Sequence, residues 1–134
     1  MSYTNNPTSI LAGAGITVTP TTGTGANSIT ISASGVQAVA VRIAVATPIT
    51  VSATTDEVIS VQVPGPVPVA VNLPAGVLGQ VFTIKDGLGL ASNPNPITIT
   101  PAGADTIDGA ATATITASFG SLTIVFDGGQ WILI

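Results

Sequence analysis

Apolar residues alternate with polar or small residues along most of this chain, and the spacing typical of helices is nearly absent. The clearest run is residues 39–45, with valine or isoleucine at every odd position and alanine or arginine at every even one. Successive side chains of a β-strand point to opposite faces, so a period of two predicts strands. Roughly ten short strands are expected, at residues 16–19, 29–32, 39–45, 49–51, 59–63, 67–73, 81–86, 97–100, 112–117, 122–126 and 131–134.

Glycine, proline, asparagine and aspartate separate these runs and predict the turns between them. Residues 20–27 are expected to form a hairpin-type loop, and Asp127-Gly128-Gly129 the last hairpin turn. Proline cannot donate to a strand ladder, so the strand containing Pro68 should lie at an edge or begin pairing after it.

The number and spacing of these strands predict an all-β fold. We expect an antiparallel β-sandwich or jelly-roll-like domain at residues 36–134, preceded by an extended N-terminal arm and a β-hairpin at residues 1–35. Residues 1–9 are polar and have no period, so they are expected to become ordered on a partner. A frayed terminus is the alternative.

Charged residues make up only 6% of the chain, whereas about 25% is typical of a soluble domain. Apolar residues reach 46%. A soluble monomer usually keeps a well-charged surface that prevents association. We therefore expect a surface rich in hydroxyl groups that is partly covered by neighbouring subunits. A monomer coated by hydroxyl groups is the alternative.

The sparse charge also excludes two classes of partner. Arg42 and Lys85 are the only cations, against six acidic residues, and two dispersed bases cannot neutralise a row of phosphates. The same deficit argues against a basic membrane-surface helix. The uncharged stretches within residues 58–84 contain several prolines and glycines, so a transmembrane helix is not expected, and the N-terminal residues show no export signal.

The side chains offer little catalytic chemistry. Histidine and cysteine are both absent, which excludes serine–histidine and cysteine–histidine nucleophiles and thiolate metal sites. Asp105 and Asp108 are the nearest candidates for a glycosidase pair, but in a glycine-rich loop aspartate more often caps a turn through nearby backbone N–H groups. Together with Asp127 they could collect around calcium, although the regular spacing of a calcium loop is missing. We predict no enzyme activity, no cofactor and no metal site.

The remaining polar motifs are expected to be structural. Asp56-Glu57 is typical of a solvated turn. Gly13-Ala14-Gly15 and Gly87-Leu88-Gly89 lack the strand-to-helix context of a phosphate loop and are interpreted as turns.

Three side chains are given specific structural roles. Arg42 and Lys85 are each expected to pair with a carboxylate, within or between subunits. Trp131 is expected to anchor the core with its indole N–H paired, and a role in stacking on a ligand is the alternative.

The later part of the chain resembles a β-module of tailed-bacteriophage virion proteins, of the kind that ends many fibres and spikes. The resemblance lies in residues 73–75, 79–86, 95–101, 105–110 and 120–131, which read LPA, GQVFTIKD, NPITITP, DTIDGA and GSLTIVFDGGQW. Residues 11–18 and 28–32 are similar to short β-segments that recur in the same proteins.

The resemblance implies a homotrimer located in the virion and assembled in the host cytoplasm. A chain this short lacks the long shaft of a fibre, so we expect a capsid decoration, or cement, protein that clamps the major capsid protein. The alternative is the receptor-binding tip of a tail fibre or spike, with residues 87–96 and 101–111 contacting a host glycan. A polysaccharide-degrading enzyme is disfavoured by the missing histidine and the sparse carboxylates.

Overall fold

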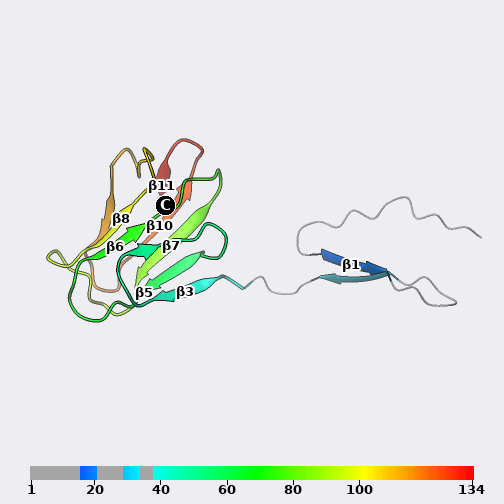
Figure 1. Ribbon diagram of the computed structural model, residues 1–134, viewed down its shortest axis with the longest axis horizontal. Coiled ribbons are helices and arrows are strands. Elements are labelled where there is room, and N and C mark those ends of the chain that lie inside the picture. The colour runs from blue at the N-terminus through cyan, green and yellow to red at the C-terminus, as the bar shows by residue number, and fades with distance from the viewer. Residues whose placement is uncertain (1–15, 21–28, 34–37) are drawn as a thin grey trace, which may run out of the picture. The chain divides into compact units, whose positions relative to one another are not determined.

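The computed structural model describes residues 16–20, 29–33 and 38–134. These residues form eleven strands, and no helix occurs among them, so the predicted all-β fold is confirmed (Figure 1). The chain divides into two compact units, Met1–Ala38 and Val39–Ile134, which are considered separately.

The first unit contains a two-stranded antiparallel sheet. Strand β1 (Ile16–Pro20) pairs with β2 (Ile29–Ala33), with Ile16 opposite Ala33 and Pro20 opposite Ile29. The predicted pair of strands is therefore confirmed. The loop predicted between them and the N-terminal arm lie outside the described residues.

The second unit holds the other nine strands in two sheets. The five-stranded sheet has the order β11-β10-β7-β5-β3, and the four-stranded sheet has the order β4-β6-β8-β9. The strands are β3 (Val41–Ala44), β4 (Ile49–Thr50), β5 (Val58–Val61), β6 (Val69–Asn72), β7 (Val81–Asp86), β8 (Ile97–Thr100), β9 (Ala113–Ile115), β10 (Ser121–Phe126) and β11 (Trp131–Leu133).

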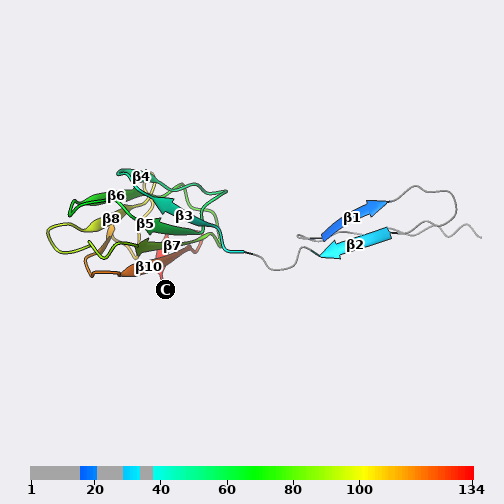
Figure 2. The same ribbon diagram turned by 90° about the horizontal axis from the view of Figure 1, so that it is seen from below.

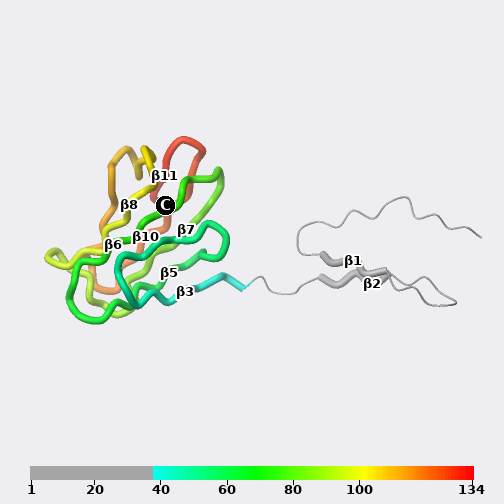
Figure 3. Tube along the Cα trace, in the orientation of Figure 1, coloured from blue at the N-terminus to red at the C-terminus, as the bar shows by residue number. Residues whose placement is uncertain are grey.

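Successive strands from β3 to β8 alternate between the two sheets. Figure 3 traces the path of the chain through them. Because the chain visits the other sheet before it returns, β3, β5 and β7 run parallel, and so do β4, β6 and β8. The expectation of antiparallel sheets was wrong for these pairs, since a period of two is the same in parallel and antiparallel strands. Both sheets are mixed.

Strands β9, β10 and β11 add the antiparallel pairs at the other ends of the sheets. The turn between β10 and β11 is closed by the Asp127 N–H, which donates to the Gln130 C=O at 3.0 Å, with Gly128 at a φ of 103°. The predicted last hairpin is therefore confirmed. Strand β6 begins at Val69, directly after Pro68, as one of the two alternatives for that proline predicted.

The alternate side chains that point inward from both sheets form one hydrophobic core. In β7, for example, Phe82, Ile84 and Asp86 are buried while the residues between them are not. Trp131 is fully buried, with its ring centroid 5.6 Å from that of Phe82 and 5.3 Å from that of Phe126. The prediction that Trp131 anchors the core is confirmed. Figures 1 and 2 show β3, β5 and β7 side by side, with β3 at the edge.

Candidate interaction surface

The large apolar side chains around β3 point away from the core. Val39, Val41, Ile43 and Val45, here called the β3 stripe, are each 59–63% exposed. Of the two alanines between them, Ala44 is buried at 7% exposure, as expected for a face that another layer approaches closely, and Ala40 is exposed. The stripe therefore adds little to the core, because burial of these side chains would require a partner.

A hollow of about 280 Å³ lies on the same sheet beside the stripe. Its lining residues are Val39, Glu57, Val58, Val81 and Thr83. We call it the β3–β7 hollow. Val81 is itself 44% exposed, so the hollow continues the apolar surface from β3 towards β7. Glu57 is the one ionisable side chain in its lining.

The backbone of the stripe faces the free edge of the sheet. The N–H groups of Val58 and Gln62 donate to the C=O groups of Ala40 and Ala44, at 2.9 and 2.7 Å. Alternate residues of a strand direct their backbone groups to opposite sides, so those of Val41 and Ile43 point away from β5. No described strand pairs with β3 on that side. Apolar side chains and an unpaired edge thus coincide.

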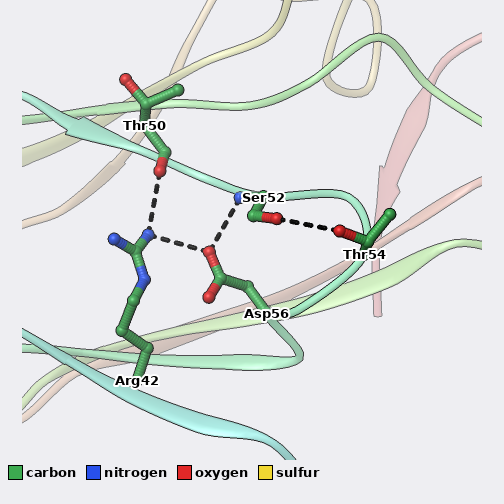
Figure 4. Close-up of polar contacts among 5 residues, drawn as sticks. All are labelled: Arg42, Thr50, Ser52, Thr54 and Asp56. Carbon is green, nitrogen blue, oxygen red and sulfur yellow. Dashed lines mark hydrogen bonds and ion pairs between the residues drawn. The ribbon is translucent and has the colours of Figure 1, made fainter.

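The Arg42 side chain, on β3, contacts Thr50 and Asp56, as Figure 4 shows. Its Nη2 atom lies 2.9 Å from Asp56 Oδ2 and donates to the Thr50 C=O at 3.0 Å. The Ser52 N–H donates to the same Asp56 oxygen at 2.8 Å. Because Thr50 belongs to β4, the guanidinium joins the first strands of the two sheets.

This network corrects one prediction and completes another. The Asp56 side chain is only 2% exposed, so the interpretation of Asp56-Glu57 as a solvated turn was wrong for Asp56. Glu57 is exposed, and its carboxylate accepts the Ala40 N–H at 2.9 Å. The expected carboxylate partner of Arg42 is Asp56, within the chain.

Lys85 has no carboxylate partner within residues 38–134, which contain every acidic side chain of the sequence. It contacts the Phe119 C=O instead, and its Nζ atom lies 5.7 Å from the centroid of the Phe119 ring. Of the two alternatives predicted for Lys85, a carboxylate partner within the chain is not found among these residues, and a partner on another subunit stays a prediction.

Asp86 organises the loop after β7. Its buried carboxylate accepts N–H groups from Leu88 (3.2 Å), Gly89 (3.0 Å), Ala91 (3.0 Å) and Phe119 (3.1 Å). Burial raises the pKa of Asp86, but these backbone donors outweigh it and hold the pKa below its usual value of 3.8. Two amides of the Gly87-Leu88-Gly89 segment are thus bonded to the chain's own carboxylate, which agrees with its interpretation as a turn.

Asp105 and Asp108 bond to segments distant in sequence. Asp105 Oδ2 accepts the Gly76 N–H at 3.2 Å, and Asp108 Oδ1 accepts the Leu133 N–H at 3.3 Å. The prediction that they cap their own turn through nearby amides was wrong. Asp127 does cap its own turn, because its Oδ1 accepts the N–H groups of Gly129 and Gln130 at 2.8 Å each, which lowers its pKa. Across the described part of the chain, no three acidic side chains lie close enough to hold a metal ion.

Gln130 connects the loop before β9 to the final hairpin, and sequence reasoning missed it. Its Oε1 accepts the Gly109 N–H at 2.8 Å and the Thr106 hydroxyl at 3.2 Å. The Trp131 N–H donates to the Thr106 C=O at 2.9 Å beside it. The indole Nε1 of Trp131 has no hydrogen-bond partner among the described residues, so the predicted pairing of that group was wrong.

No family model and no curated protein matches this chain. Among the described residues, no helix is long and apolar enough to cross a membrane.

Proposed function

We propose that this chain is a non-enzymatic structural protein of a tailed-phage virion, acting as a trimeric capsid decoration protein that bridges capsid subunits. One observation carries the proposal: a chain with only two basic and six acidic residues presents the β3 stripe, four exposed branched side chains on a free sheet edge. Such a surface is typical of a protein that functions within an assembly.

The acidic side chains support the non-enzymatic part of the proposal. Catalytic acids and bases must reach a substrate. Each of the six carboxylates in the sequence accepts a backbone N–H, which gives each of them a structural role. The donors are Ser52 for Asp56, Ala40 for Glu57, Leu88 and three others for Asp86, Gly76 for Asp105, Leu133 for Asp108, and Gly129 and Gln130 for Asp127.

Two of the motifs that carry the resemblance to phage β-modules contact one another. Residues 105–110 and 127–131 are joined through Gln130 and through the bridge between Ile107 and Trp131. The two mixed sheets, which share one core, are proposed to form a β-sandwich. The motifs within residues 73–131 thus belong to one compact unit.

A receptor-binding tip is the second candidate, favoured by Phe119. This side chain is 61% exposed, lies beside the loop after β7 and stands next to Lys85. An exposed ring beside a cation is a surface on which a sugar could stack, although it is a single ring.

Co-sedimentation separates the two candidates. Purified full-length protein is mixed with expanded capsids that lack decoration protein, and separately with intact host cells. Binding to capsids with increased heat resistance of the capsid is the expected result. If the protein binds only to cells, and a Phe119→Ala variant loses that binding, the result would contradict the capsid role and support the receptor role. Binding to neither would contradict both.

A further inference from the structure

β3 is the longest of the four edge strands in the second unit. Natural proteins usually blunt an edge with a very short strand, a charge or a proline. The other edge strands, β4, β9 and β11, have two, three and three residues. β3 has four, and its outward side chains carry no charge.

The free edge of β4 is also partly occupied. The Val51 N–H donates to the Asn72 C=O of β6, so the backbone groups of Thr50 face the opposite side. Arg42 Nη2 donates to the Thr50 C=O there. Arg42 thus satisfies an edge carbonyl of β4, while the edge groups of β3 have no described strand beside them.

We propose that a second copy of this chain covers this surface, with the β3 stripe of one copy seated in the β3–β7 hollow of the next. The stripe is a row of protruding branched side chains, and the hollow is an apolar depression in the same sheet. A second copy of the chain brings both an apolar row and an apolar depression of this kind.

The electrostatics of the surface favour the same occupant. A strongly basic partner could form an ion pair in the hollow only with Glu57, whose carboxylate already accepts the Ala40 N–H. An acidic partner would find no cation among the residues of the stripe or the hollow. The chain's own uncharged stripe buries apolar area there and brings no further ion to desolvate. The inference deepens the proposed function, on which it rests, by naming the surface that assembles the oligomer.

Sedimentation velocity of the full-length protein at about 50 μM, well above the micromolar affinities of modest interfaces, tests this contact. The wild-type chain is expected to sediment as an oligomer, and the Val41→Lys/Ile43→Lys variant as a single chain. The matched control is Val77→Lys/Leu78→Lys, at positions 62% and 74% exposed outside the stripe and the hollow, which should remain oligomeric. Fluorescence of the buried Trp131 reports whether each variant is folded.

A milder variant guards against misfolding. Val41→Thr/Ile43→Thr keeps the branched β-formers but removes apolar area, and it should raise the dissociation constant at least tenfold. A monomeric wild type, or a lysine variant that is folded and still oligomeric, would overturn the inference.

Capsid binding keeps the two proposals distinguishable. A monomeric wild type that still binds capsids would contradict the proposed contact between copies and would support the decoration role. An oligomer that depends on the stripe but binds no capsid would support the proposed contact between copies and would contradict the decoration role.

Discussion

Arg42 and Asp56 form an ion pair, 2.9 Å between Nη2 and Oδ2, that ties β3 to the segment following β4. The pair is unevenly solvated, because the Arg42 side chain is 38% exposed and the Asp56 side chain 2%. Since the large side chains of β3 face outward, its attachment to the core depends on Ala44, on the ladder with β5 and on this pair. The strand that we propose as the contact between copies is thus positioned by a polar interaction.

Replacing Asp56 with asparagine should therefore destabilise the second unit. The change removes the buried charge that faces Arg42, with little change in shape. Loss of one partner costs about 3–5 kcal/mol in a fully buried pair and about 1 kcal/mol or less in an exposed one, so we expect about 1–3 kcal/mol here. Urea unfolding followed by Trp131 fluorescence measures it.

Glu57→Gln is the matched control for that variant. It removes the same charge at the next residue, but Glu57 is exposed and glutamine can still accept the Ala40 N–H. Its effect should stay below about 0.5 kcal/mol, as for most surface substitutions. Equal losses in the two variants would show that the Arg42 pair has no special role.

Asp86 makes stability depend on pH below about 4, near the usual pKa of a carboxyl group. Its pKa is lowered in the folded chain, so its stabilising effect is complete above the unfolded pKa and is lost as pH falls through the folded pKa. The free energy of unfolding should therefore decrease as the pH falls below about 4. Asp86→Asn should destabilise the protein at pH 7 and flatten this acid-side slope. Urea unfolding across this pH range checks both effects.

Asp127→Asn controls for the general effect of acid. Asp127 also has a lowered pKa, but its carboxylate is exposed in the final hairpin turn. We expect a smaller change in the pH dependence than for Asp86→Asn. An acid-side slope that Asp86→Asn leaves unchanged would rule out Asp86 as its main source.

Sequence reasoning located most strands but not their partners. The alternation in residues 81–86 placed Phe82, Ile84 and Asp86 on one face, as the structure has them, and Pro68 indicated where β6 begins. Parallel pairing could not be predicted, because alternation records which face a side chain occupies and not which strand lies beside it. That choice depends on connections such as residues 51–57, where Asp56 meets Arg42.

For a related reason, the candidate surface could be predicted only in part from the sequence. The run at residues 39–45 predicted two faces and indicated that the small residues approach another layer, which is confirmed for Ala44, whereas Ala40 is exposed. The free edge beside the large residues follows from the strand order, which is a tertiary property. The partners of Asp105 and Gln130 are likewise far apart in sequence and could not be predicted from local turn chemistry.

Gly76 should tolerate no side chain, because a Cβ atom there would overlap the ring of Phe126. Gly76→Ala must displace that ring, which packs against Trp131, and overpacking of this kind costs about 1–3 kcal/mol. Thermal unfolding checks the loss. At Gly129 a Cβ atom would lie 3.6 Å from the nearest atom, an ordinary contact, so Gly129→Ala is the control and should unfold near the wild-type temperature.

Gln130→Ala should loosen the connection between the loop before β9 and the final hairpin. The variant leaves the Gly109 N–H and the Thr106 hydroxyl without their acceptor, at a cost of about 1–2 kcal/mol because both groups retain access to water. Gln130→Glu keeps an acceptor and should recover most of the stability at pH 7. Hydrogen exchange of the Gly109 amide is the direct measurement, with faster exchange expected in the alanine variant. Unchanged exchange at Gly109 would show that the Gln130 bond does not hold this loop.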